Sequence, residues 1–371
     1  MLQPDVARTG RFVGRLWRVD ADGPAIVKIQ SGRLVDITSR ETPTMAALLE
    51  REDLIAYVDT ADGDDIGPLE EVDALLAPCD LQAVKACGVT FARSMIERVI
   101  EEKAAGDASR AEAIRAHLHE LIGDSLGDVV PGSPQAAKIK LALIEEGIWS
   151  QYLEVGIGPD AEIFTKSQPM SSVGYGVPIG LHPMSNWNNP EPEIVLAVDS
   201  RGRVRGAALG NDVNLRDVEG RSALLLGKAK DNNASCAIGP FIRLFDETYT
   251  IDDVRRAELK LQVEGEDGFV LDGESSMSEI SRDPLDLVAQ TIGQHHQYPD
   301  GFMLFLGTLF APVKDRDAPG QGFTHRIGDM VTIANADLGT LRNMVSLSTE
   351  CPPWAFGAGA LMRNLAARGL L

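Results

Sequence analysis

Short apolar runs separated by turn residues dominate the first sixty positions of the chain. The runs are rich in β-branched and aromatic residues, a pattern typical of strands, and they predict strands at residues 12–17, 25–29 and 34–37. A helix is expected near residues 45–52, and the acidic, glycine-containing stretch 59–65 has the composition of a surface loop or linker. We therefore expect a small, β-rich N-terminal α/β module over residues 1–80.

The pattern changes to helical spacing between about residues 95 and 150. Ile114, Leu118, Leu121 and Ile122 follow the i, i+4, i+7, i+8 spacing of one helical face. Pro134 is expected to open a further helix that runs to Glu146, because proline is tolerated in a first helical turn. This stretch is interpreted as a helical insertion in a catalytic domain that spans residues 81–371.

From residue 151 onward the chain is β-rich, with frequent glycine and proline. Residues 259–263 and 269–271 flank an acidic, glycine-containing turn and predict a hairpin. A helix is expected at 286–297, and the wholly apolar run 302–306 predicts a buried strand. The fold class predicted for the whole chain is α+β.

Charge and composition narrow the possible partners. The chain has 371 residues, and its 55 acidic against 35 basic residues give a formal net charge of −20. Nucleic acid and anionic membrane are therefore disfavoured as partners, because both require a basic surface. No apolar run reaches membrane-spanning length, and the N-terminus lacks the pattern of a signal peptide. The four cysteines are scattered, which favours reduced thiols in a cytoplasmic protein.

Two carboxylates directly precede an apolar run, in the segment Pro190-Glu191-Pro192-Glu193-Ile194. Residues i and i+2 of a strand share a face, so Glu191 and Glu193 are expected to project side by side. Asp212 follows at the end of the next predicted strand. Adjacent anions repel unless a cation or proton holds them. Three oxygen ligands without a nearby Cys or His suit Mg²⁺ or Mn²⁺, and the sequence leaves the choice between the two ions open.

Basic residues lie close to these acids in the sequence. Arg216, Lys228 and Lys230 all follow Asp212 within twenty residues. A divalent cation with lysine and arginine nearby would bind a 2-oxo acid and polarise its carbonyl, which acidifies the adjacent C–H. Other interpretations remain open at this point: Lys230 as a salt-bridge partner of Asp217, Arg216 as a structural residue, and Lys166 as an exposed residue.

Together these motifs resemble the fumarylacetoacetate hydrolase family over residues 85–371. The matching residues are the Glu191-x-Glu193 pair with Asp212, the spacing of Asp212 to Arg216-Asp217, Lys230 six residues before Cys236, Phe164-x-Lys166, and Gly307-Thr308. The resemblance implies a mixed β-sheet roll surrounded by helices and a homodimer or homotetramer.

The departures from the family pattern point to one branch. Hydrolytic members carry a His-x-x-Glu pair; here Glu97 matches the acid, but Ser94 occupies the histidine position. Because an unassisted serine is a poor general base, this weighs against water activation. Glu219 also stands where many members have glutamine. The chain most closely resembles the sugar-acid branch, which implies dehydration of a 2-keto-3-deoxy-pentonate to 2,5-dioxopentanoate.

The resemblance also suggests roles for individual residues. Lys230 is the preferred base or enolate stabiliser and Glu97 the candidate acid for the leaving hydroxyl, while Ser94 marks the loss of the hydrolytic base. The candidate substrate-binding residues are Arg216, Thr308, Lys166 and Glu219. The rival functions are hydrolysis or decarboxylation of an acylpyruvate-type 2-oxo acid and, from another class, non-catalytic binding of a sugar acid.

Overall fold

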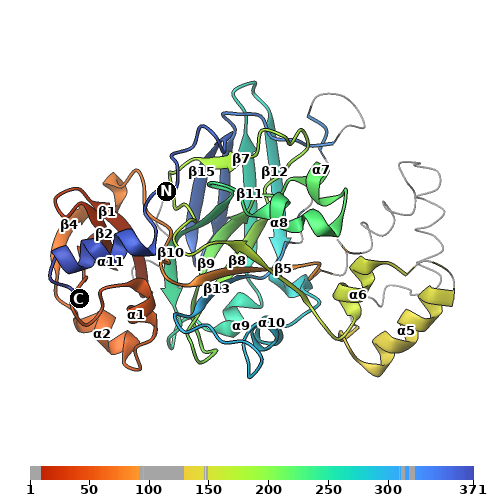
Figure 1. Ribbon diagram of the computed structural model, residues 1–371, viewed down its shortest axis with the longest axis horizontal. Helices are drawn as coiled ribbons and strands as arrows, with labels where there is room; N and C mark the ends of the chain where they lie inside the picture. Colours follow the sequence, from red (N-terminus) through yellow and green to blue (C-terminus); the bar gives the residue numbers. More distant parts are fainter. Residues whose placement is uncertain are drawn as a thin grey trace.

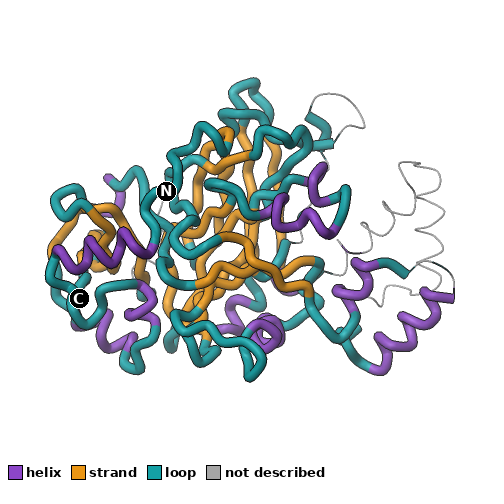
Figure 2. The backbone as a smooth tube through the Cα atoms, viewed as in Figure 1, coloured by secondary structure: helices purple, strands orange, loops and turns teal. Residues whose placement is uncertain are grey.

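The computed structural model of the chain describes residues 10–91, 95, 129–145, 147, 149–308, 310, 314–316 and 322–371. In these residues the strands form a ten-stranded and a five-stranded sheet, and most helices lie at the periphery (Figures 1 and 2). The predicted α+β class is confirmed.

The ten-stranded sheet has the order β4-β3-β2-β1-β10-β9-β8-β13-β5-β6. Its strands are β1 (Phe12–Arg18), β2 (Gly23–Gln30), β3 (Arg33–Asp36), β4 (Asp64–Pro68), β5 (Ala83–Gly88), β6 (Glu162–Ser167), β8 (Pro192–Val198), β9 (Val204–Asp212), β10 (Cys236–Leu244) and β13 (Phe302–Phe305). The pairs are antiparallel except β13 with β5, which is parallel. The three N-terminal strands and the buried strand at residues 302–306 were therefore predicted correctly.

The second sheet packs against the central strands of the first. It contains β7 (Ile179–Leu181), β11 (Glu258–Glu264), β12 (Val270–Ser276), β14 (Met330–Asn335) and β15 (Gly339–Leu347), in the order β12-β11-β14-β15-β7. Strands β11 and β12 form the predicted hairpin. Leu196 and Leu209 from the first sheet share one buried cluster with Leu261, Ile333 and Leu341 from the second. This apolar layer fixes the central strands of the large sheet from one side.

The N-terminal strands continue the large sheet, because β1 pairs with β10. The helix expected near residues 45–52 is confirmed as α1 (Met45–Leu49), and a second helix, α2 (Leu54–Thr60), follows it where none was predicted. Strand β4 begins at Asp64, inside the predicted loop. The C-terminal helix α11 (Ala358–Ala367) returns to this part of the molecule (Figure 1). Asn364 of α11 donates to the carbonyls of Ala21 and Asp22. The boundary near residue 80 stays a prediction.

The described part of the predicted helical insertion, α5 and α6, lies at the opposite end of the molecule (Figure 1). The helix predicted from Pro134 is confirmed as α5 (Pro134–Glu145), and α6 (Gln151–Ile157) follows it. The predicted face from Ile114 to Ile122 falls outside the described residues.

The remaining helices are short: α7 (Arg216–Glu219), α8 (Leu226–Lys230), α9 (Ile251–Val254) and α10 (Pro284–Thr291). The prediction of a helix over residues 286–297 was wrong at both ends. Asp283 caps the first turn of α10, with Pro284 at its first position, so the helix begins earlier. It ends before a turn in which Gly293 and His296 exchange backbone hydrogen bonds.

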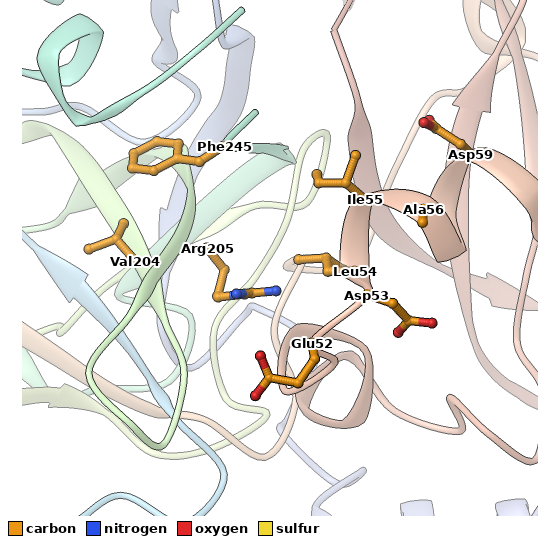
Figure 3. A pocket seen from close by; sticks show the side chains of 9 residues that line it. All are labelled: Glu52, Asp53, Leu54, Ile55, Ala56, Asp59, Val204, Arg205 and Phe245. Atoms are coloured by element: carbon orange, nitrogen blue, oxygen red, sulfur yellow. The ribbon is translucent and has the colours of Figure 1, made fainter. Parts of the chain in front are cut away.

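A cavity of about 500 Å³ lies between α2 and the beginning of β9 (Figure 3). Leu54 and Ile55 line it on the α2 side, with Val204, Arg205 and Phe245 opposite. Val204 begins β9, so the cavity lies at the opposite end of that strand from Asp212.

No helix in the described ranges is long and apolar enough to cross a membrane.

Close packing of β8, β9 and β13 depends on a glycine at position 210. A Cβ atom there would overlap Phe305 and Val195, which both lie in buried strands. We predict that Gly210→Ala lowers the free energy of unfolding by about 1–3 kcal/mol through overpacking. Gly293→Ala is the matched control, because no atom lies within 4 Å of its Cβ position. Denaturant midpoints of the two variants test this, and equal midpoints would contradict it.

Candidate metal centre

Three carboxylates converge where β8 begins and β9 ends. Glu193 lies in β8 opposite Gly210 of β9, and the Asp212 amide donates to the carbonyl of Glu191 at 3.0 Å. One carboxylate oxygen from each of Glu191, Glu193 and Asp212 lies within 4.8 Å of the others, and all three residues are buried. The antiparallel pairing therefore brings together the acids that the sequence predicted as metal ligands.

Two buried lysines face these acids. Lys230, at the end of α8, places its Nζ 2.5 Å from Glu191 Oε2 and 3.1 Å from Asp212 Oδ2. Lys166, in β6, places its Nζ 2.7 Å from Asp212 Oδ1 and also donates to the carbonyls of Val213 and Lys230. Lys166 has no solvent-exposed surface, so the interpretation of it as an exposed residue was wrong.

The alternative that paired Lys230 with Asp217 is not what the structure shows. Asp217 accepts hydrogen bonds from the Ser185 hydroxyl at 2.7 Å and the Asn186 amide at 2.8 Å. Lys230 instead pairs with Glu191 and Asp212. The lysine therefore belongs to the acidic cluster.

The pKa values of Glu193 and Lys230 are both raised in this crowded group of carboxylates. Burial raises the pKa of Glu193 well above its ordinary value, and Asp212 and Glu191 raise it further, although the Gly307 amide donates to Glu193 Oε2 at 2.7 Å. Burial alone would lower the pKa of Lys230. The Asp212 and Glu191 carboxylates outweigh burial, so the pKa of Lys230 lies above its ordinary value. In the metal-free protein Lys230 is thus held as an ammonium group.

The donor set fits a hard divalent cation. It consists of carboxylate oxygens, which Mg²⁺ and Mn²⁺ both accept. When all are ionised, three carboxylates against two ammonium groups leave one uncompensated negative charge in a buried site. Neither lysine bonds to Glu193 in the described contacts, and its pKa is raised first by burial and then by the neighbouring Asp212 and Glu191 carboxylates.

Two asparagines that the sequence analysis gave no role belong to the site. Asn211 Oδ1 accepts from the Glu191 amide at 3.1 Å. Asn214 Nδ2 donates to Glu191 Oε1 at 3.0 Å and to Glu219 Oε2 at 2.6 Å. The alternation of strand faces offered a signal for Asn214, since it lies two residues after Asp212.

Four further residues were predicted to belong to the site: Arg216, Thr308, Ser94 and Glu97. Arg216, half-buried in α7, stacks its guanidinium 4.3 Å from the ring centre of Trp187. Thr308 follows Gly307 directly, and its hydroxyl accepts from the Phe310 amide at 3.1 Å. Ser94 and Glu97 lie outside the described residues. The substrate-binding and catalytic roles of all four stay predictions.

Comparison with known proteins places the site within a matched region. Residues 161–346 match the family described as the fumarylacetoacetate (FAA) hydrolase C-terminal region. The range contains the three acids, both buried lysines and Asn214. It excludes Ser94 and Glu97.

Two curated relatives match part of the chain. The probable 2-keto-3-deoxyxylonate dehydratase of Haloferax volcanii is 30% identical over 202 residues, which cover 54% of this chain and 66% of the relative. The 2-dehydro-3-deoxy-D-arabinonate dehydratase of Saccharolobus solfataricus is 30% identical over 180 residues, covering 48% and 57%. Each match spans less than two thirds of the relative's length.

A solved structure shares the fold of almost the whole chain. It is a 2-keto-3-deoxy-D-arabinonate dehydratase complexed with magnesium and 2,5-dioxopentanoate, with a TM-score of 0.62 and 20% identity. The superposition covers 91% of this chain and 99% of that chain. The predicted mixed-sheet roll is confirmed by this likeness.

The raised pKa of Glu193 leads to a prediction about stability. A carboxyl group whose pKa is higher in the folded state stabilises the fold at low pH, and this contribution is lost as pH rises through the folded pKa. We therefore expect Glu193→Gln to stabilise the metal-free protein above that pKa, because it removes the penalty of an ionised buried group.

Thermal unfolding across a pH series tests this expectation, and a variant less stable than wild type at pH 8 would contradict it. The same variant should lose the stabilisation by Mg²⁺. Wild type should gain about 2.7 kcal/mol when Mg²⁺ is a hundredfold above its Kd.

Proposed function

This chain belongs to the fumarylacetoacetate hydrolase family, and from that premise we propose that it is a divalent-metal-dependent dehydratase of a 2-keto-3-deoxy-pentonate. The product would be 2,5-dioxopentanoate. The observation that carries the proposal is the buried cluster of Glu191, Glu193, Asp212 and Lys230. The names of both curated relatives support the choice of reaction.

The three acids would hold Mg²⁺ or Mn²⁺. When bound, such an ion would polarise the 2-oxo acid group and make its neighbouring C–H more acidic. The magnesium in the related solved structure supports the first of the two ions.

Lys230 would take the C3 proton and stabilise the enolate that results. It lies between Glu191 and Asp212, whose carboxylates raise its pKa, and a divalent ion held by these acids would compensate their charge and weaken that effect. The neutral amine would accept the proton from C3, and the ammonium group so formed would stabilise negative charge on the enolate oxygen.

Other residues of the chain would bind substrate and move protons. Glu97 would protonate the departing C4 hydroxyl, and Arg216 and Thr308 would bind the substrate carboxylate. Lys166 forms an ion pair with Asp212 and donates to two backbone carbonyls, which supports a role in orienting Asp212 rather than in reaching the substrate. The C4 hydroxyl would leave as one molecule of water, and rearrangement of the unsaturated product would then give 2,5-dioxopentanoate.

We further propose a homodimer or homotetramer that acts in the cytoplasm. The family resemblance supports the assembly. The cysteines Cys79, Cys87, Cys236 and Cys351 are all free and buried, which supports a reducing compartment.

Turnover of 2-keto-3-deoxy-D-xylonate tests the proposed reaction. We expect aldehyde formation that requires added Mg²⁺ or Mn²⁺ and stops with EDTA, followed through a coupled aldehyde dehydrogenase. An acylpyruvate assayed in parallel separates the hydrolytic alternative, which would release pyruvate. Thermal stabilisation by the sugar acid without any product would instead identify a binding protein.

A lysine pair in α8 allows a matched test of Lys230. We predict that Lys230→Met lowers kcat on the order of 100-fold or more, because a preorganised charge at the reacting oxygen is lost. Lys228→Met is the control, since Lys228 lies in the same helix but is exposed. Near-normal turnover of Lys230→Met in the folded protein would remove this lysine from the mechanism.

A further inference from the structure

The cavity between α2 and β9 lies apart from the metal centre and has a largely apolar lining. Of the nine residues that line it, five are apolar: Leu54, Ile55, Ala56, Val204 and Phe245. Its volume of about 500 Å³ is within the range of sites that bind small molecules. Because Leu54 and Ile55 belong to α2 and Val204 to β9, a ligand here would contact two elements at once.

Arg205 carries the only positive charge among the described residues that line this cavity. Its guanidinium group points from the β9 side toward α2 (Figure 3). Nη2 donates to the carbonyl of Arg51 at 2.7 Å, whereas Nε is buried and has no hydrogen-bond partner. The described contacts of Arg205 include no ion pair. Arg205 is therefore a half-buried cation with unused hydrogen-bond donors.

The three acids that line the cavity are each paired with a different arginine. The ion pairs are Glu52 with Arg203 at 2.7 Å, Asp53 with Arg51 at 2.8 Å, and Asp59 with Arg11 at 2.8 Å. Burial lowers the pKa of Arg205, and Arg203 lowers it further, so the nearby carboxylates do not fully compensate its charge. An anion inside the cavity would compensate it.

We propose that the cavity is a second ligand site of this protein, that it takes a small organic carboxylate with a short apolar chain, and that Arg205 binds the carboxylate group. The planar guanidinium group of arginine matches the geometry of a carboxylate. The apolar walls would cover the chain of the ligand, which an inorganic anion lacks. The site lies at the opposite end of β9 from Asp212, so it is separate from the site of the proposed reaction.

A simpler explanation of the cavity makes a different prediction. The cavity would then be an imperfect contact between α2 and β9 that water fills, and Arg205 would serve only to join the two elements through the carbonyl of Arg51. That role predicts no saturable binding of any small molecule. A titration with matched probe molecules separates the two explanations.

The experiment titrates the full chain with butyrate and hexanoate at constant ionic strength and measures each Kd by NMR. EDTA is present, so that no metal ion at the acidic cluster can bind a carboxylate. Hexylamine has the same chain as hexanoate with the opposite charge, and inorganic phosphate is an anion without a chain. Arg205→Met is compared with Arg201→Met, which removes an equal charge from an exposed arginine that pairs with Glu52 but does not line the cavity.

We expect wild type to bind hexanoate saturably, with an affinity that rises about fourfold for each methylene from butyrate to hexanoate, because apolar surface is buried. Hexylamine and phosphate should each bind about tenfold more weakly than hexanoate, or weaker still. Arg205→Met should weaken hexanoate binding about tenfold or more, because a charge-assisted hydrogen bond is lost. Arg201→Met should keep the wild-type Kd.

Several results would overturn the inference. Hexylamine or phosphate that binds as tightly as hexanoate would contradict the class of ligand. An unchanged Kd in Arg205→Met, or no saturable binding to wild type, would contradict the site itself. If Arg205→Met does not fold, Arg205→Lys decides, since it keeps the charge without the planar group and should weaken hexanoate binding; an unchanged Kd there would count against the role of Arg205. All of these outcomes are independent of the proposed reaction.

Discussion

Partial compensation of three buried carboxylates by two buried lysines is the interaction on which the rest of this site depends. Removing ionised groups from water is costly unless each is paired and hydrogen-bonded. Lys230 and Lys166 pair with Glu191 and Asp212, while Glu193 has the Gly307 amide and a raised pKa. The balance leaves a site in which one more cation is electrostatically favourable, and this is the property that a metal-dependent enzyme requires.

The large sheet must curl to make that pairing possible. Four strand spacings separate β6 from β9 in the sheet order, which would be about 19 Å if the sheet were flat. Lys166 of β6 nevertheless lies 2.7 Å from Asp212 of β9. Beyond β6, Val173 forms a parallel bridge with Ala237 of β10, so the chain that leaves one edge returns to the interior of the sheet. The curled sheet thus brings Lys166 of β6 to the acids of β8 and β9. The cavity lies at the other end of β9, away from these acids.

Much of the site was predictable from the sequence, because strand periodicity and motif spacing depend only on residues that are near one another in the chain. The two-residue period of a strand placed Glu191 and Glu193 on one face. Motifs such as Asp212 with Arg216-Asp217, and Lys230 six residues before Cys236, carried the family resemblance, which the family match confirms. The burial of Lys166 and the partners of Lys230 were not predictable in this way. They depend on how β6 curls back and how α7 and α8 cross the strand ends, and no local pattern encodes those paths.

The sequence by itself determined the α+β class, many of the strands, the candidate metal ligands and the family, because periodicity, turn chemistry and motif spacing are properties of the chain. Tertiary structure decided which charges meet. It brought Lys166 to Asp212 and joined Asn214 to both Glu191 and Glu219. It also ended α10 before the predicted residue 297. The physical reason is that contacts between distant elements, and the cost of burying unpaired charge, act only once the sheet has closed around them.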